Sequence, residues 1–187
     1  MAEDRRRARV AGIGSYTPDK VLTNKDLEEM VDTSDEWISK RTGIKERRIA
    51  ADDQAASDLG YHAAQKALAN SDLSAGDLDL ILVATSTPDY LGFPSTACIL
   101  QEKLGVEAIP AFDLAAACTG FIYGMSVAAQ YIETGTYNNI LVIGSEVFSK
   151  ILDWEDRDTC VLFGDGAGAA VLTPAQEGGV LANTLGA

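Results

Sequence analysis

Two apolar runs, Leu78–Thr85 and Ile140–Gly144, constrain the fold of this chain more than any other sequence feature. Both have the length of a strand, and apolar residues stand at consecutive positions in them. Such runs are typical of strands that are covered on both faces. Helical patterns lie between the strand-like segments, which predicts βαβ units. We therefore expect an α/β fold with a five-stranded, mostly parallel mixed sheet and helices on both faces, in the order βαβαβαββ.

The other elements are predicted from side-chain periodicity, cap residues and glycine stops. The expected helices run from Asn24 to Met30, from Thr33 or Ser34 to Lys40, from about Ser57 to Asn70, from Ser95 to Gly105, and from after Cys118 to Gly135, and the further expected strands are Arg9–Ser15 and 109–114. Two late β-like runs, 159–163 and 167–172, are joined by Gly164-Asp165-Gly166, which we interpret as a tight hairpin or close-packing loop. No helix follows these glycines, so they do not form a dinucleotide-binding loop. The late pair predicts an antiparallel strand at one edge of the sheet.

The charge and the cysteines argue against several classes of function. The net charge of −13 makes nucleic acid an improbable partner, because phosphates repel an acidic surface. No apolar run approaches the roughly 20 residues that cross a bilayer, so we expect no membrane insertion. The three cysteines lack the spacing of a zinc site or a disulfide framework, and they fit a reducing cytoplasm without a bound metal. We expect one cytoplasmic domain over residues 1–187.

Cys118 is the candidate nucleophile. It follows the apolar run 109–117 and stands directly before an amphipathic helical pattern. Unpaired backbone N–H groups and the positive end of the helix dipole favour a thiolate at such a position. Cys98 lies within an expected helix and Cys160 precedes an expected strand, so both are interpreted as small buried residues.

A nucleophilic cysteine is often paired with a histidine. The chain has one histidine, His62, and we expect it on the surface of a helix between Asp58 and Lys66. Two alternatives stay open: the helix dipole alone activates Cys118, or its partner comes from another segment.

Trp37 and Arg41 stand four residues apart on one expected helix, so the ring and the guanidinium share a face. The pair could be a core tryptophan beside a surface arginine, or a platform for a flat ring with a cation for phosphate. Arg157 stands alone among the acidic residues of 153–158 and could simply neutralise them. The cations within 40–48 form either a solvated face or a landing site for an anionic group, and they are Lys40, Arg41, Lys45, Arg47 and Arg48.

Several segments together resemble the β-ketoacyl-acyl-carrier-protein synthase III family, the condensing enzymes that start bacterial type II fatty-acid synthesis. The segments that carry the resemblance are Gly12–Pro18, Asp32–Ile38, Arg41–Ile44, Phe93–Ser95, Asp113–Phe121 and Phe163–Ala169. The resemblance implies a thiolase-like fold made of two similar five-stranded halves. This sequence resembles the N-terminal half, so the second half is expected to be absent from it.

The resemblance also implies a reaction, a decarboxylating Claisen condensation. In the family a cysteine, here Cys118, is acylated by an acyl-CoA, usually acetyl-CoA. A histidine and an asparagine of the second half then promote decarboxylation of malonyl-acyl-carrier protein, and the carbanion attacks the thioester. No residue of this sequence matches that histidine and asparagine, so the 187-residue chain is expected to accept an acyl group at best.

By matching position, Trp37 and Arg157 would flank the adenine of coenzyme A, and Arg41 would lie near the same nucleotide. Phe93 would sit on a loop that closes the acyl pocket across a homodimer. The resemblance implies no cofactor, since coenzyme A enters as part of the substrate. Competing interpretations are a related starter-unit synthase, of the polyketide or 3-hydroxy-3-methylglutaryl-CoA synthase type, and a non-catalytic structural half-module.

Overall fold

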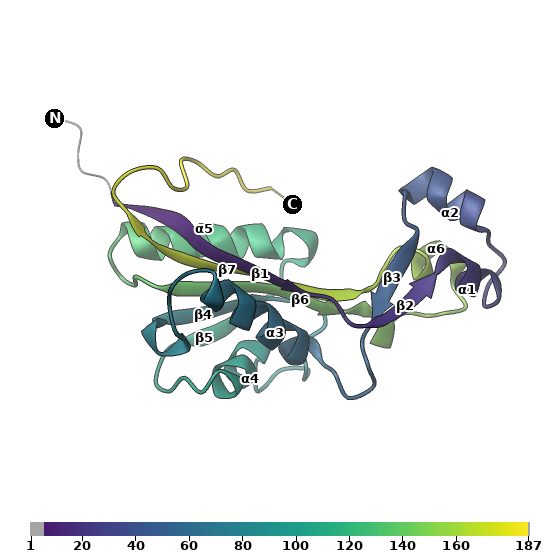
Figure 1. Ribbon diagram of the computed structural model, residues 1–187, viewed down its shortest axis with the longest axis horizontal. Helices are drawn as coiled ribbons and strands as arrows, with labels where there is room; N and C mark the ends of the chain where they lie inside the picture. The colour runs from purple at the N-terminus through teal and green to yellow at the C-terminus, as the bar shows by residue number, and fades with distance from the viewer. Residues whose placement is uncertain (1–5, 187) are drawn as a thin grey trace.

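A twisted five-stranded sheet forms the centre of the computed structural model, which describes residues 6–186 (Figure 1). Residues 1–5 and 187 of the predicted domain 1–187 lie outside the described residues. The strand order is β1-β7-β6-β4-β5. Strand β4 pairs in parallel with both of its neighbours, β6 and β5, whereas β7 pairs antiparallel with β6 and β1. The strands are β1 (Arg7–Tyr16), β4 (Leu80–Ala84), β5 (Ala111–Leu114), β6 (Ile140–Val147) and β7 (Asp165–Ala175).

Helices cover both faces of this sheet, as predicted. Helices α3 (Ala56–Ala69) and α4 (Thr96–Lys103) lie on one face and α5 (Gly120–Glu133) on the other (Figure 1). The side chains of β4 alternate between the two layers: Ile81 packs with the α3 and α4 residues, and Leu82 packs with those of α5. All five β4 residues are buried, which explains the uninterrupted apolar run. Each such Leu or Ile stabilises the fold by about 1.5–3 kcal/mol relative to an exposed side chain.

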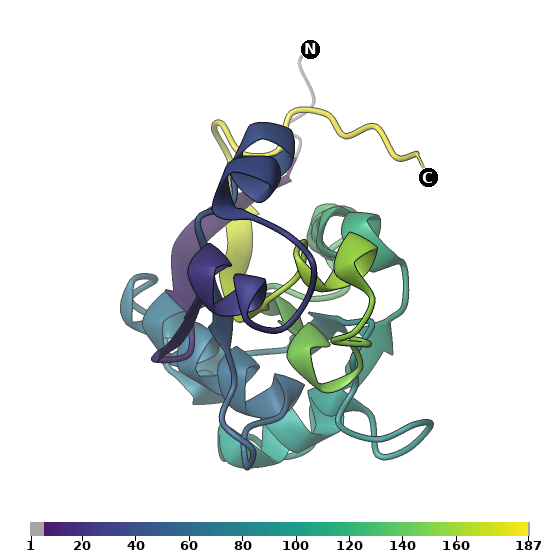
Figure 2. The same cartoon turned by 90° about the vertical axis from the view of Figure 1, so that its right-hand side faces the viewer.

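A smaller layer extends from one end of the main sheet. It contains a two-stranded antiparallel sheet, β2 (Lys20–Thr23) with β3 (Glu46–Ile49), and the helices α1 (Asn24–Glu28), α2 (Asp35–Thr42) and α6 (Arg157–Cys160). These helices pack around a core of their own, made of Leu27, Ile38, Cys160 and Val161. Figure 2 views this end directly, with α1 and α2 in purple and blue and α6 in green. Strands β2 and β3 are only four residues long and show no alternation of apolar and polar residues, so the sequence analysis did not predict this sheet.

Three local predictions need correction. The N-cap of α1 is Thr23 and not Asn24, because the Thr23 hydroxyl accepts the Asp26 N–H while the Asn24 side chain turns inward. The run 159–163 is no strand, because Asp156 caps the short helix α6 and turns Cys160 inward. Strand β7 begins at Asp165, so the glycines at 166 and 168 lie within a strand and make no hairpin.

The antiparallel strand also lies elsewhere than predicted. Strand β7 is inside the sheet, between β6 and β1, and the edges are β1 and β5. The other expected elements are confirmed to within a few residues, including the Ser34 cap of α2 and its stop at Gly43, which has φ of 76°. Within residues 6–186, no helix combines the length and the apolar character that crossing a membrane requires.

Candidate active site

Cys118 lies in a short 3₁₀ turn, Ala117–Thr119, which joins the end of β5 to the start of α5. Its side chain is exposed and is not part of a disulfide. The preceding residue, Ala117, has φ of 45°, a left-handed conformation that is unusual for a residue with a Cβ. Backbone strain of this kind clusters at functional sites, where the surrounding structure holds it in place. The turn therefore presents the thiol at the amino end of a 14-residue helix.

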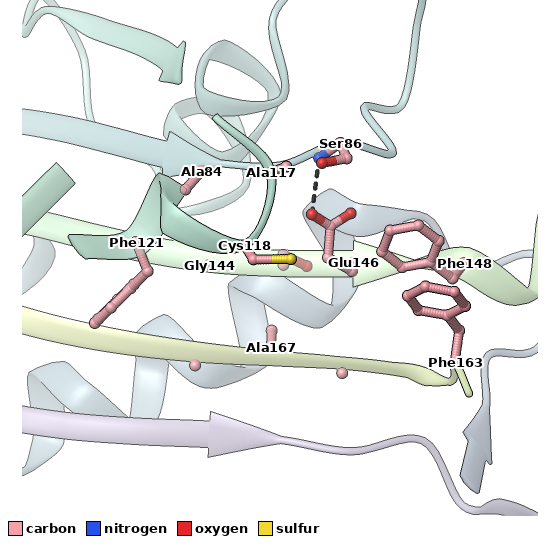
Figure 3. A pocket seen from close by; sticks show the side chains of 13 residues that line it. Ala84, Ser86, Ala117, Cys118, Phe121, Gly144, Glu146, Phe148, Phe163 and Ala167 are labelled. Atoms are coloured by element: carbon pink, nitrogen blue, oxygen red, sulfur yellow. Dashed lines mark hydrogen bonds between the residues drawn. The ribbon is translucent and has the colours of Figure 1, made fainter. Parts of the chain in front are cut away.

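A mostly apolar hollow of about 390 Å³ opens beside this thiol (Figure 3). Glycines of two neighbouring strands make room for it: a Cβ added at Gly168 would meet no atom within 4 Å. At one end the rings of Phe148 and Phe163 stack with their centroids 4.7 Å apart. The residues that line the hollow are Ala84, Ser86, Ala117, Cys118, Phe121, Gly144, Ser145, Glu146, Phe148, Phe163, Gly166, Ala167 and Gly168.

Glu146 is the charged residue of this lining. One carboxylate oxygen accepts the backbone N–H of Ser86 at 2.8 Å (Figure 3). The other accepts the hydroxyl of Thr87 at 2.6 Å. The Thr87 hydroxyl in turn accepts the N–H of Val147 at 2.8 Å. Glu146 thus fixes the start of the loop that follows β4. The sequence held a signal for it, since Glu146 follows an apolar run at the carboxyl end of a strand, where α/β sheets place functional groups.

The predicted tryptophan–arginine cluster, made of Trp37, Arg41 and Arg157, is assembled in the structure. The Cζ atom of Arg41 lies 4.3 Å from the centroid of the Trp37 ring, and that of Arg157 lies 4.7 Å from it. Arg157 also approaches the carboxylate of Asp32 at 3.8 Å. Two guanidinium groups therefore contact one indole, although they come from helices α2 and α6 that are far apart in sequence. Each contact stabilises the cluster by about 0.5–1 kcal/mol.

His62 does not reach this site. It lies on α3, which covers the sheet face opposite α5, and its ring packs 4.6 Å from that of Tyr16. It is half-buried there. The structure therefore offers no Cys118–His62 pair.

Phe93 and the other two cysteines complete the list of predicted positions. Phe93 is 90% exposed on the loop between β4 and α4 and does not line the hollow. Cys160 is buried, as predicted. The prediction that Cys98 is buried is wrong, because Ala97 and Leu100 of α4 face the core and leave Cys98 exposed. Among residues 6–186, no group of three or more His, Cys, Asp or Glu side chains is placed to hold a metal ion.

Comparison with known proteins identifies similar sequences. Residues 112–187 match the family model of 3-oxoacyl-[acyl-carrier-protein] synthase III. A protein of Desulfitobacterium hafniense (strain DSM 10664 / DCB-2) named β-ketoacyl-[acyl-carrier-protein] synthase III is 61% identical over 95% of this chain and 54% of its own length. The protein of that name from Caldanaerobacter subterraneus subsp. tengcongensis is 59% identical over 96% of this chain and 54% of its own length. The chain spans about half the length of these curated relatives.

Solved structures agree with the sequence matches. The 3-oxoacyl-[acyl-carrier-protein] synthase III of Aquifex aeolicus VF5 superimposes with a TM-score of 0.88 at 52% identity, over 91% of this chain and 55% of that one. The priming β-ketosynthase of the R1128 polyketide pathway superimposes with a TM-score of 0.89 at 38% identity, over 92% of this chain and 52% of that one. In sequence and in fold, the chain is similar to β-ketoacyl-acyl-carrier-protein synthase III proteins over about half of their length.

Proposed function

We propose that this chain is the acyl-accepting, N-terminal half of a β-ketoacyl-acyl-carrier-protein synthase III. The sulfur of Cys118 attacks the thioester carbonyl carbon of an acyl-CoA, with acetyl-CoA as the primer. A new carbon–sulfur bond to Cys118 forms, the bond to the coenzyme A sulfur breaks, and the proton lost by Cys118 goes to the released thiolate. The observation that supports this step is the exposed thiol in an apolar hollow at a strained turn.

Coenzyme A would bind at the tryptophan–arginine cluster and would itself be the only small-molecule group required, with no further cofactor. The Trp37 ring offers a flat surface for the adenine, and Arg41 and Arg157 offer cations for the phosphates. Both guanidinium groups contact the ring of Trp37. Binding of the adenine would therefore require at least one of them to move from the ring toward a phosphate.

Condensation with malonyl-acyl-carrier protein would follow the acylation. Loss of CO₂ leaves a carbanion on the carrier-bound acyl group, which attacks the thioester carbonyl and releases the Cys118 thiolate. The histidine and asparagine that promote this step in the family have no match in these residues, and His62 lies across the sheet from Cys118. We propose that a second thiolase-like half, in the same polypeptide or as another chain, supplies them.

The protein would work as a cytoplasmic homodimer. Strand β5 is an edge strand of the main sheet, and the loop after β4 carries apolar side chains that are almost fully exposed, Leu91 at 98% and Phe93 at 90%. A second copy that covers this loop would place Phe93 in its partner's acyl pocket. A cytoplasmic location agrees with the free, exposed thiols of Cys98 and Cys118, because an oxidising compartment would favour their oxidation to disulfides.

A starter-unit synthase for polyketides is the second candidate function. The R1128 priming β-ketosynthase superimposes as well as the fatty-acid enzymes do, so the fold of these residues does not distinguish the two. The primer would distinguish them, because a starter-unit synthase would load a primer other than acetyl.

Intact mass measured after incubation with acetyl-CoA tests the acylation. We expect one added acetyl group, absent in Cys118→Ala and retained in Cys98→Ala, the variant at the other exposed thiol. Acetyl on Cys98, or none on Cys118 when the chain is folded, would contradict the proposal for this chain. Repeating the incubation with butyryl-CoA and isobutyryl-CoA ranks the primers: a clear preference for these would favour the starter-unit synthase.

A further inference from the structure

Arg47 is a buried charge that the proposed chemistry leaves without a role. It stands on β3 and is only 6% exposed. Its guanidinium donates to three oxygens at 3.0–3.1 Å: the Leu22 carbonyl, the Asn24 side-chain oxygen (twice) and the Val161 carbonyl. No carboxylate of the described residues pairs with it. Burying a cation that has only neutral partners costs free energy of folding. Packing alone therefore does not account for an arginine at this position.

The Asn24 side chain extends this contact to both ends of α2. Its amide donates at 2.8 Å to the carboxylate of Asp35, the first residue of α2, and at 2.7 Å to the carbonyl of Ile44, just beyond the Gly43 cap. The Asp35 carboxylate also accepts the Ser39 hydroxyl at 3.1 Å. Helix α2 carries Trp37 and Arg41. The Arg47–Asn24 pair therefore holds the helix that supplies two members of the tryptophan–arginine cluster.

The Val161 carbonyl extends the contact in the other direction. Val161 directly follows α6, which carries Arg157, and Phe163 two residues later lines the hollow at Cys118. Strand β3 also approaches this segment closely, since a Cβ at Gly164 would lie 2.8 Å from the Cβ of Arg47. The guanidinium of Arg47 thus links Asn24, which holds helix α2, to the stretch 157–163, which carries Arg157 and Phe163.

We propose that Arg47 is a positioning residue: through Asn24 and Val161 it holds α2 and α6 in the one arrangement in which Trp37 and Arg157 form a common surface for a nucleotide. This inference rests on the proposed function, because the nucleotide is that of coenzyme A. The geometry also explains the residue type. The two terminal nitrogens of the guanidinium stand apart, so one reaches the Leu22 carbonyl, the other reaches the Val161 carbonyl, and both reach Asn24, whereas the three donors of a lysine ammonium share one nitrogen.

The first test follows the cluster without any ligand. Trp154→Phe leaves Trp37 as the sole tryptophan, and its fluorescence then reports contact with Arg157. Arg157→Met gives the reference spectrum for a ring without that guanidinium. Adding Arg47→Met should shift the emission and the acrylamide quenching toward this reference, while the control Arg48→Met, which removes the same charge from the same strand, should not. An unchanged Trp37 signal in folded Arg47→Met would overturn the inference whether or not coenzyme A binds.

The second test compares the binding of coenzyme A with that of 4′-phosphopantetheine, which lacks the nucleotide. We expect Arg47→Met and Arg47→Lys to raise the Kd for coenzyme A about 10- to 100-fold, the effect of misplacing a binding group, with little change for 4′-phosphopantetheine. If Arg47→Lys retains the affinity, the charge alone matters and the inference is wrong. If wild type binds neither compound while the Trp37 signal responds as expected, the positioning holds and the proposed nucleotide site fails.

Folding of the variants is checked by near-UV circular dichroism. Should Arg47→Met fail to fold, Asn24→Ala makes the same test from the other side. It keeps the bonds of Arg47 to Leu22 and Val161 but cuts the link to α2. Asn24→Ala should raise the Kd for coenzyme A by a similar factor. A folded Asn24→Ala variant with wild-type affinity and wild-type Trp37 fluorescence would refute the proposal that Arg47 positions α2 through Asn24.

Discussion

Asp165 is the position at which a single substitution should affect both the fold and the hollow. Its carboxylate is 7% exposed at the start of β7. It accepts the Ala50 N–H at 2.6 Å, the Ser149 N–H at 2.9 Å and the Ser149 hydroxyl. It thereby joins the end of β3 to the turn that carries Phe148, one of the stacked rings in the hollow. Asp165→Ala removes all three acceptor contacts at once.

The cost follows from the groups left behind. A buried N–H without an acceptor costs about 1–3 kcal/mol and a lost hydroxyl hydrogen bond about 0.5–1.5 kcal/mol, so the three contacts sum to about 2.5–7.5 kcal/mol. The total stability of a domain is about 5–15 kcal/mol, so Asp165→Ala should bring the protein close to unfolding. Asp165→Asn keeps one oxygen as acceptor but turns an NH₂ toward a donor, and it should cost about half as much.

Urea unfolding followed by far-UV circular dichroism measures these differences. Asp53→Ala, at an exposed aspartate, is the matched control and should change the free energy of unfolding by no more than about 0.5 kcal/mol. If the midpoint of Asp165→Ala shifts as little as that of the control, the three contacts carry no net stability and the reasoning fails. The slope of the transition should stay constant, since the surface exposed on unfolding is unchanged.

Three further outcomes are expected. Iodoacetamide should modify Cys118 and Cys98 in the folded protein but Cys160 only after unfolding, because burial raises the pKa of the Cys160 thiol and blocks access; peptide mass mapping checks this. Gly168→Leu should slow Cys118 acetylation by about tenfold or more, with little change in the unfolding midpoint, because Gly168 lines the hollow and a Cβ at this position would meet no atom within 4 Å. Hydrogen bonds from an asparagine amide and a serine hydroxyl hold the pKa of Asp35 below 3.8, so its stabilising contribution is complete above that pH and is lost as the pH falls through the lower folded value. Thermal midpoints measured from pH 5 down to pH 2 should therefore fall less steeply in Asp35→Asn, and equal slopes would contradict this.

The main sheet could be predicted because its inner strands are buried on both faces, and such strands consist of consecutive apolar residues. The buried run of β4 and the Ser34 and Gly43 ends of α2 are examples of such local signals. The small β2–β3 sheet has no such apolar run in its sequence. Its strands are only four residues long, Lys-Val-Leu-Thr and Glu-Arg-Arg-Ile, and neither shows an alternation of apolar and polar residues.

The candidate site could be predicted in its chemistry but only partly in its surroundings. Cys118 and the Trp37 cluster follow from local patterns and from the family resemblance. The exposure of Cys98 does not, because it depends on which face of α4 meets β5. The burial of Arg47 was equally hidden: in the sequence it is one cation of a basic run, and only the packing of α6 shows that it alone turns inward.

The place of β7 in the sheet has a consequence for synthesis of the chain. Among the strands of the described residues, β1 is made first and pairs with β7, the last of them to be made: Arg7 lies opposite Ala175 and Tyr16 opposite Ala167. On the ribosome, β1 must therefore wait without a partner while nearly all the other elements emerge. Until β7 arrives, β6 also keeps an open edge that is a template for pairing with other chains. Contacts between such distant segments slow folding, so this sheet should close only after residues 165–175 have left the ribosome.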